Sequence, residues 1–207
     1  MPTTPSLGVL ASGRGTNLQA LLDAHARGDL GWPVGVVISN NSGAGALSLA
    51  RSAHVPTAHI SGASHEDPGA AILATLRAHG VEVVVLAGYL KLLDARVVRA
   101  YRGRVLNIHP APLPRFGGPG MYGDRVHRAV LDAGVTCTGP TVHLVDEVYD
   151  QGEVLAHRAV PVAPDDTVAR LSERVLQAEH DLLWRVIQRR FCEGAAPTSP
   201  TTPGDQS

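Results

Sequence analysis

Short apolar runs alternate with stretches of helical spacing along the first half of the chain. The apolar runs are typical of buried strands, and they lie at residues 7–12, 32–39, 55–60, 81–88 and 104–110. The stretches between them repeat apolar residues every three or four positions, as helices do, and they lie at residues 17–28, 44–54 and 68–80. Strands separated by helices predict an α/β fold with a doubly wound, mostly parallel sheet.

The pattern changes in the second half. Residues 139–145 and 152–162 form two extended runs with a short acidic connection, which predicts an antiparallel C-terminal addition to the sheet. A long C-terminal helix is expected from about residue 167 to 190, with Asp165 or Asp166 as its N-cap.

The two ends of the chain differ in composition from the part between them. Residues 1–6 are rich in Pro and Thr, and residues 193–207 include a low-complexity tail, so both are expected to be disordered. The folded unit is therefore predicted to be residues 7–192.

Composition narrows the class of partner. Hydrophobic residues make up 44% of the 207 positions, and the 18 Lys and Arg nearly balance the 19 Asp and Glu, so neither a nucleic acid nor a membrane is favoured as the main partner. The two cysteines, Cys137 and Cys192, have neither disulfide-framework nor zinc-site spacing. A cytoplasmic location fits, because no secretory signal is evident at the start.

The first candidate site is the sequence SGRGTN at residues 12–17, between a predicted strand and helix. Gly13 and Gly15 permit tight turns, and the free amides of a helix start favour an anion. The third glycine of a dinucleotide fingerprint is replaced by Leu18. The loop is thus equally well interpreted as a phosphate site or as a plain turn capped by Asn17.

The second candidate site lies at the end of the fifth predicted strand. Asn107 and His109 are two positions apart and project to the same side, and Pro110 ends the strand behind them. The amide and the imidazole together can stabilise the oxyanion of an acyl transfer. Taken alone, the pattern favours the alternative, a strand end with a hydrogen-bonded histidine.

An acidic turn supplies the third candidate. Asp146, Glu147 or Asp150 can place a carboxylate near the histidine and raise its pKa, although a solvated acidic turn is the commoner structure. No serine or cysteine nucleophile stands out, since Ser12 lacks a GxSxG setting and Cys137 has no base nearby in sequence. No metal is expected, because no cluster has metal-ligand spacing.

Taken together and in this order, these segments resemble the phosphoribosylglycinamide formyltransferase family, which uses folate in purine synthesis. The resemblance covers nearly all of residues 7–188 and is carried by LASGRGTNLQALLDA, VISNNSGAGALSLARSA, VVVLAGYLKLL, RVLNIHPAPLP, TGPTVHLVDEVYDQGEVL and QAEHDLLWRVI. It implies a Rossmann-like formyltransferase domain at residues 7–192. It also implies transfer of a formyl group from the co-substrate 10-formyltetrahydrofolate to glycinamide ribonucleotide, without a metal.

The resemblance also implies roles for individual residues. The catalytic group is expected to be Asn107, His109 and Asp150. The residues expected to bind the phosphorylated substrate are Gly13, Gly15, Thr16, Asn17, Gln177 and Glu179. Those expected to hold the folate are Tyr89, Leu90, Lys91, Leu92, Leu93, Asn107, Asp146, Glu147, Val148, Tyr149 and Asp150.

The sequence departs from the family pattern in three places. Many members have Phe-Met-Arg at positions 89–91, where this chain has Tyr-Leu-Lys, and the pocket is expected to tolerate this change. His65 or a neighbour stands where some members have an Arg near the folate tail. Residues 115–131 form a longer segment than the usual loop, and its His127 is expected to be structural or binding.

Three alternatives to this function stay open. A formyltetrahydrofolate hydrolase would be expected to carry a further N-terminal domain, and a methionyl-tRNA formyltransferase a basic additional domain. A non-catalytic nucleotide-binding module would not need Asn107, His109 and Asp150. The chain is expected to act as a monomer or a homodimer.

Overall fold

The computed structural model describes residues 5–148 and 150–193. Its centre is a seven-stranded sheet in the order β3-β2-β1-β4-β5-β7-β8, and a separate two-stranded sheet pairs β6 with β9. The strands are β1 (Ser6–Leu10), β2 (Val34–Ser39), β3 (Thr57–His59), β4 (Val81–Leu86), β5 (Val105–His109), β6 (Cys137–Thr138), β7 (Thr141–Leu144), β8 (Val154–His157) and β9 (Val160–Pro161). The helices are α1 (Thr16–Ala26), α2 (Gly45–Ser52), α3 (Pro68–Ala78), α4 (Ala95–Ala100), α5 (Asp124–Asp132), α6 (Val168–Ile187) and the short π-helix η1 (Gln188–Cys192).

The sheet is wound in two directions from its middle. Strands β1 to β5 run parallel, whereas β7 and β8 are antiparallel to their neighbours. The chain winds outward from β1 to β3, returns to β4 beside β1, and then winds the other way. The predicted doubly wound, mostly parallel sheet with an antiparallel addition is confirmed, and so is the long C-terminal helix. Ligands of such sheets bind beyond the carboxyl ends of the strands, where the winding reverses.

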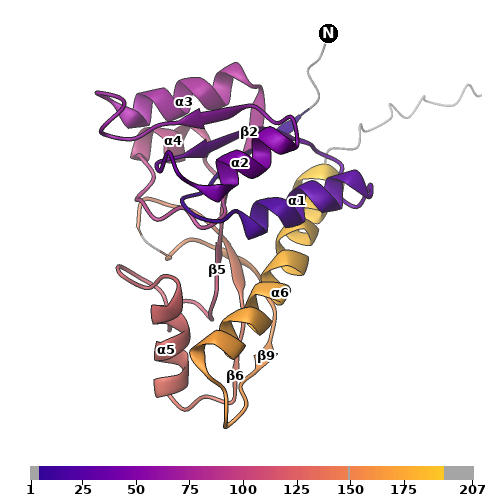
Figure 1. The fold of residues 1–207 in the computed structure, drawn as a ribbon, viewed down its shortest axis with the longest axis vertical. Helices are drawn as coiled ribbons and strands as arrows, with labels where there is room; N and C mark the ends of the chain where they lie inside the picture. The colour runs from indigo at the N-terminus through magenta and orange to yellow at the C-terminus, as the bar shows by residue number, and fades with distance from the viewer. Residues whose placement is uncertain (1–4, 149, 194–207) are drawn as a thin grey trace, which may run out of the picture.

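Helices cover both faces of the sheet (Figure 1). One core cluster joins alternate sheet residues such as Leu7 and Val9 to the helices α1, α2 and α6. The other joins Leu10 and Ile38 to α3 and α4. Because neighbouring residues of a strand face opposite ways, a strand buried on both faces is apolar throughout, as the continuous runs in the sequence are.

The lower part of the molecule in Figure 1 has a core of its own, formed by α5, the first half of α6 and β9. Phe116, Val126, Val130, Leu171 and Val175 are buried there. The helix α5 was not expected, because the resemblance placed a long loop at this point. Its buried face is only Val126, His127 and Val130, which is too short a pattern to stand out in sequence.

Two further details of the sequence prediction are wrong. The N-cap of α6 is Thr167, whose side chain accepts a hydrogen bond from the Arg170 N–H, and not Asp165 or Asp166. The Asp166 carboxylate instead accepts from the Ala163 N–H at 2.8 Å and pairs with Arg174. The run at 152–162 also divides into β8 and β9, which belong to different sheets.

The described elements run from Ser6 to Cys192. Residues 1–4 and 194–207 lie outside the described part of the chain, so the expectation of disordered termini stays a prediction.

Candidate active site

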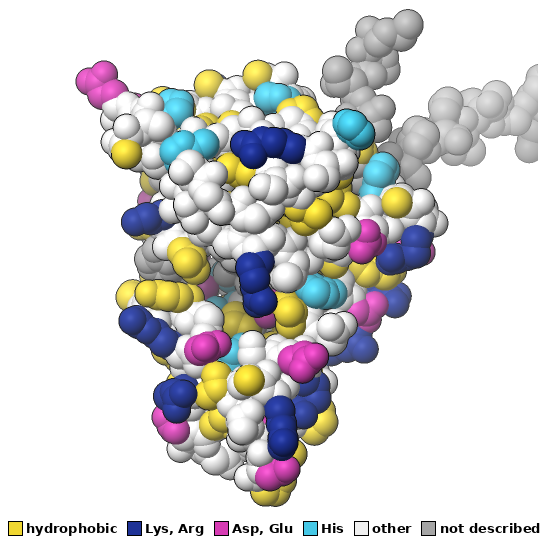
Figure 2. Space-filling view, viewed as in Figure 1, with side chains coloured by type: hydrophobic (Ala, Val, Ile, Leu, Met, Phe, Trp, Pro, Cys, Tyr) yellow, Lys and Arg dark blue, Asp and Glu magenta, His cyan; other side chains and the backbone are white. Residues whose placement is uncertain are grey.

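A cavity of about 510 Å³ opens at the carboxyl ends of β1, β4 and β5. Its wall is formed by the loops after these strands, by residues 118–123 and by one face of α6. Figure 2 shows the surface hollowed at mid-height, between the upper part that carries α2 and α3 and the lower part that carries α5. The loops that the sequence marked as important therefore converge on one site.

The loop between β1 and α1 contributes bare backbone amides to this wall. Gly15 is the N-cap of α1 and has a φ of 88°, in the left-handed region that favours glycine. A Cβ on Gly15 would lie 2.8 Å from the Cα of Ala46, so a larger residue would displace α2. No side chain caps the first turn of α1, which leaves its N–H groups available to an anion.

Asn17 lies within the first turn of α1 and does not cap it, so the interpretation of this residue as a cap is wrong. Its Nδ2 donates to Glu179 Oε2 at 2.7 Å, and both side chains are buried in the cavity wall. Burial raises the pKa of Glu179 to about 7, although the hydrogen bond from Asn17 opposes the rise. The wall thus holds a carboxyl group that titrates near neutral pH.

Four polar side chains meet beside the end of β5. Asn107 and His109 both line the cavity, as their spacing predicted. Asn107 Nδ2 lies 3.0 Å from Nε2 of His143, which stands opposite it on β7. The Asp150 carboxylate lies between two imidazoles, with Oδ1 3.5 Å from His143 Nε2 and Oδ2 3.8 Å from His109 Nδ1. Of the three acidic candidates, Asp150 is the one placed against His109.

The pKa of His109 is lowered, which differs from the expectation that a carboxylate would raise it. Burial favours the neutral imidazole and outweighs the opposing effects of the Asp150 charge and of the Phe116 carbonyl. His109 Nε2 lies 2.8 Å from the Phe116 carbonyl oxygen, which can only accept, so the proton of the neutral ring belongs on Nε2. His109 Nδ1, on the side of Asp150, is therefore the basic nitrogen.

Asp150 is ionised at neutral pH. Burial alone would raise its pKa, but the contacts of the carboxylate with His143 and with the Gly118 N–H outweigh that effect and lower the pKa. The Gly118 N–H donates to Asp150 Oδ2 at 2.8 Å. Asp150 has a φ of 55°, a left-handed conformation that is rare outside glycine, and a Cβ on Gly117 would lie 2.9 Å from the Asp150 Cβ. A strained backbone and a closely packed loop thus hold this carboxylate.

The segment Tyr89–Leu93 follows β4 and lines the cavity. Leu93 is buried, whereas Leu90 and Leu92 are 55% and 59% exposed. Val148, across the acidic turn, is 57% exposed and also lines the cavity. Large apolar side chains exposed at the mouth of a cavity are typical of a ligand-binding site, where the bound ligand covers them.

Some predicted site residues do not reach the cavity. Glu147 is exposed and lies 3.4 Å from Arg99, and Gln177 lines a separate groove between α1 and α6. His65 is not part of the cavity wall either; its Nδ1 lies 2.9 Å from Ser64 Oγ. Tyr149 lies outside the described residues. The other predicted site residues, including Thr16, Lys91 and Asp146, line the cavity.

Two histidines of the cavity wall were not predicted from the sequence to belong to the group formed by Asn107, His109 and Asp150. His143 is buried and touches both Asn107 and Asp150, but the register of β5 against β7 was needed to find it. His127 is buried on α5 and lines the cavity, with burial lowering its pKa. For His143, the sequence does hold one signal: side chains alternate between the two faces of a strand, so the segment TVHLV places His143 on a definite face.

A wound α/β sheet with free helix-start amides in its first loop and with an amide, an imidazole and a carboxylate at its switch point is typical of a class of group-transfer enzymes. Within that class, the chain belongs to the formyl transferase family, whose model matches residues 7–187.

Named relatives narrow the comparison. The chloroplastic phosphoribosylglycinamide formyltransferase of Vigna unguiculata is 42% identical over 190 residues, which are 90% of this chain and 61% of that protein. The chain thus spans about three fifths of the length of this relative. Among solved structures, glycinamide ribonucleotide transformylase 1 from Symbiobacterium toebii superposes with a TM-score of 0.86 at 40% identity, covering 94% of this chain and 90% of that one.

A formyltetrahydrofolate deformylase from Pseudomonas syringae pv. tomato is a more distant neighbour. Its TM-score is 0.79 at 26% identity, and the alignment covers 90% of this chain and 61% of that one. The fold is thus shared between enzymes named for transfer and for deformylation, and the residues of the site must separate the two.

Residues 5–148 and 150–193 contain no group of three or more His, Cys, Asp or Glu side chains arranged to hold a metal ion. No helix among them has both the length and the apolar character needed to cross a membrane.

Proposed function

We propose that this protein transfers the formyl group of 10-formyltetrahydrofolate to the amine of glycinamide ribonucleotide. The products are formylglycinamide ribonucleotide and tetrahydrofolate, as in purine synthesis. The observation that carries the proposal is the meeting of Asn107, His109 and Asp150 in a cavity that also holds an anion-binding loop and an apolar wall. The names of the Vigna unguiculata and Symbiobacterium toebii relatives support it.

The reaction needs two bond changes and one net proton transfer. The lone pair of the substrate amine attacks the formyl carbon, and the carbonyl oxygen becomes an oxyanion. The bond between that carbon and N10 of the folate then breaks. The attacking amine loses one proton and N10 gains one, so no oxidant or reductant is needed.

Asn107 is the proposed donor to the oxyanion. One of the two Nδ2 hydrogens is directed at His143 Nε2, 3.0 Å away, which leaves the other for the formyl oxygen. Held in a part-buried position on β5, the amide is oriented before the substrate arrives, so little reorganisation is needed as charge develops.

His109 is the proposed acceptor of the proton from the amine. Burial keeps the ring unprotonated and so free to accept a proton, and the Phe116 carbonyl leaves Nδ1 as the accepting atom. Protonation at Nδ1 makes His109 an imidazolium cation. The Nδ1 atom lies 3.8 Å from Oδ2 of the ionised Asp150, whose charge stabilises the cation. The protonated ring can then return the proton towards N10.

Different parts of the cavity wall suit the phosphate and sugar of one substrate and the ring system of the other. Gly13, Gly15 and Thr16 offer backbone amides to the phosphate, and Asn17 with Glu179 offers polar atoms to the sugar. The Tyr89–Leu93 segment and Val148 are the proposed apolar contacts of the folate ring system. No step requires a metal.

Formyl transfer by the purified protein tests this function. The protein is mixed with 10-formyltetrahydrofolate and either glycinamide ribonucleotide, methionyl-tRNA or water alone, and the formylated product or formate is measured by mass spectrometry. Formylglycinamide ribonucleotide is expected as the dominant product. Release of formate in water alone would show that the protein is a deformylase. Formylated tRNA would show that the acceptor is methionyl-tRNA. If the folate is not turned over under any condition, the protein is a non-catalytic module.

We also propose a cytoplasmic location. Cys137 and Cys192 are both free thiols, which fits a reducing compartment.

A further inference from the structure

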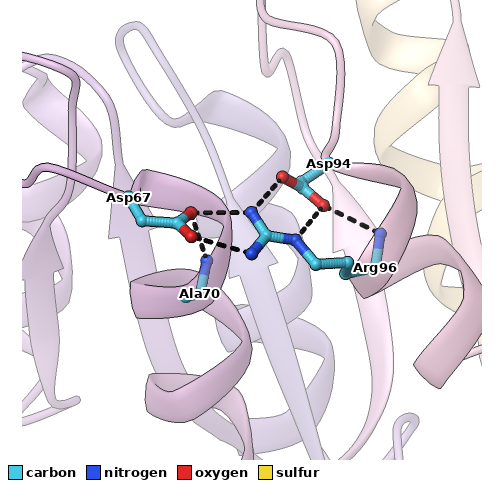
Figure 3. A network of polar contacts seen from close by, with 4 residues as sticks. All are labelled: Asp67, Ala70, Asp94 and Arg96. Carbon is cyan, nitrogen blue, oxygen red and sulfur yellow. Dashed lines mark hydrogen bonds and ion pairs between the residues drawn. The ribbon is translucent and has the colours of Figure 1, made fainter.

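One arginine joins the starts of two helices (Figure 3). Arg96 Nη1 and Nη2 donate to the two carboxylate oxygens of Asp67, each at 2.7 Å. Arg96 Nε and Nη2 donate to the two oxygens of Asp94, at 2.9 and 2.7 Å. Asp67 is the N-cap of α3 and Asp94 is the N-cap of α4, so the guanidinium ties both helix starts together.

The three side chains form a shared network and not an isolated surface pair. The hydrogen bonds from Arg96 lower the pKa of both Asp67 and Asp94, so both carboxylates stay charged at neutral pH. Exposed ion pairs usually contribute little, but bidentate arginine geometry shared by two carboxylates is the exception. A lysine cannot reproduce it, because an ammonium is a single point of charge.

A glycine makes the close approach of the two helices possible. Gly69 lies in the first turn of α3, and a Cβ at that position would overlap the Asp94 carboxylate. The same Cβ would lie 2.7 Å from Arg96 Nη2. The space for the network therefore depends on the missing side chain of Gly69.

The network stands at one end of the apolar wall of the cavity. The other end of that wall is fixed by Ser12, whose N–H donates to the Gly88 carbonyl at 3.0 Å and whose Oγ accepts from the Leu90 N–H at 2.9 Å. The wall segment Tyr89–Leu93 thus runs between the Ser12 contacts and Asp94. Arg96 itself does not line the cavity, so any effect on a ligand must pass through this segment.

We propose that Arg96 is a positioning residue for the folate: through Asp67 and Asp94 it fixes the far end of the apolar wall, so its loss weakens folate binding selectively. The inference rests on the proposed function. The phosphate loop between β1 and α1 has its own supports in Ala46 and Glu179, so binding of the phosphorylated substrate does not depend on Arg96.

Calorimetric titration of the full chain with tetrahydrofolate and, separately, with glycinamide ribonucleotide tests the proposal. In Arg96→Met the Kd for tetrahydrofolate is expected to rise roughly tenfold, because a small displacement of a positioning group has large effects. The Kd for glycinamide ribonucleotide should not change. Arg96→Lys should resemble Arg96→Met. Arg104→Met is the matched control, since Arg104 pairs with Glu82 at 2.7 Å outside the cavity wall and should leave both Kd values unchanged.

Gly69→Ala gives a second variant that disturbs the network without removing a charge. It should weaken tetrahydrofolate binding in the same selective way. If the wild type binds tetrahydrofolate and Arg96→Met binds it equally well, or if both ligands weaken together in step with a lower Tm, Arg96 has no positioning role. If the wild type itself binds no tetrahydrofolate, the proposed function fails and this inference fails with it.

Discussion

His109 is the single side chain on which turnover should depend most. It is buried, neutral in the free protein and directed at Asp150 from the end of β5. His109→Ala is expected to lower kcat on the order of 100- to 1000-fold while the fold is kept, since one group that stabilises the transition state is lost. Steady-state rates of the purified variant check this.

His65→Ala is the matched control, because His65 lies outside the cavity wall. It should turn over like the wild type. Near wild-type turnover of His109→Ala would remove this histidine from the mechanism.

Asp150 is expected to act through His109, the imidazole that it faces. Its charge raises the pKa of His109 against the stronger effect of burial, so Asp150→Asn should lower that pKa further. Turnover should fall roughly 100-fold, because the imidazolium formed in the reaction loses its partner. Asparagine tolerates the left-handed backbone at this position, so the fold should be kept. NMR titration of His109, together with steady-state rates, measures both effects.

Glu147→Gln is the control for this prediction, since Glu147 lies against Arg99 and not in the cavity. An unchanged titration of His109 in Asp150→Asn would mean that the carboxylate partner has been misassigned.

The loop from β1 to α1 is the element on which the phosphorylated substrate should depend. Gly15→Val would put a β-branched side chain at a φ of 88° and against the Cα of Ala46. The KM for glycinamide ribonucleotide should rise by roughly tenfold or more, with a smaller rise for the folate, because the amides of one anion site are displaced. Initial rates with each substrate varied in turn would show the difference.

Gly13→Ala is the matched comparison in the same loop. A Cβ on Gly13 would meet no atom within 4 Å, so this change should be much milder. An equal rise in KM for both substrates in Gly15→Val would indicate misfolding. An unchanged KM for glycinamide ribonucleotide would mean that the loop does not bind the phosphate.

The stability of the whole molecule should depend on pH through Glu179. Burial raises the pKa of Glu179 from 4.5 to about 7. Protonation of Glu179 therefore contributes fully to the free energy of unfolding below pH 4.5, and this contribution is lost as the pH rises towards 7. The loss is on the order of 3 kcal/mol at most. Glu179→Gln, which can still accept from Asn17, should remove this fall in stability between pH 4.5 and about 7.

Urea unfolding at several pH values measures the effect. Glu173→Gln, on an exposed position of the same helix α6, is the control and should keep the wild-type profile. An identical fall in Glu179→Gln and in the wild type would show that Glu179 is not the group responsible.

Much of the fold and of the site followed from local pattern. The continuous apolar runs identified β1 to β5, because strands buried on both faces have no polar side. The spacing of Asn107 and His109, two residues apart on a strand, fixed their common side. The helix α5 and the division between β8 and β9 did not follow, since each depends on a short stretch that packs against distant elements.

By itself, the sequence determined the order of β1 to β5 and of the helices α1, α2, α3 and α6. It also determined the side of β5 that carries Asn107 and His109, and the glycines of the first loop. These depend on chain periodicity and on backbone freedom, which are local properties. Only the tertiary structure decided that Asp150 and not Glu147 meets His109, that His143 lies between Asn107 and Asp150, and that Gln177 stands outside the cavity. It also decided the low pKa of His109, because burial comes from residues far away in the chain, and no local pattern specifies how deeply they will enclose a ring.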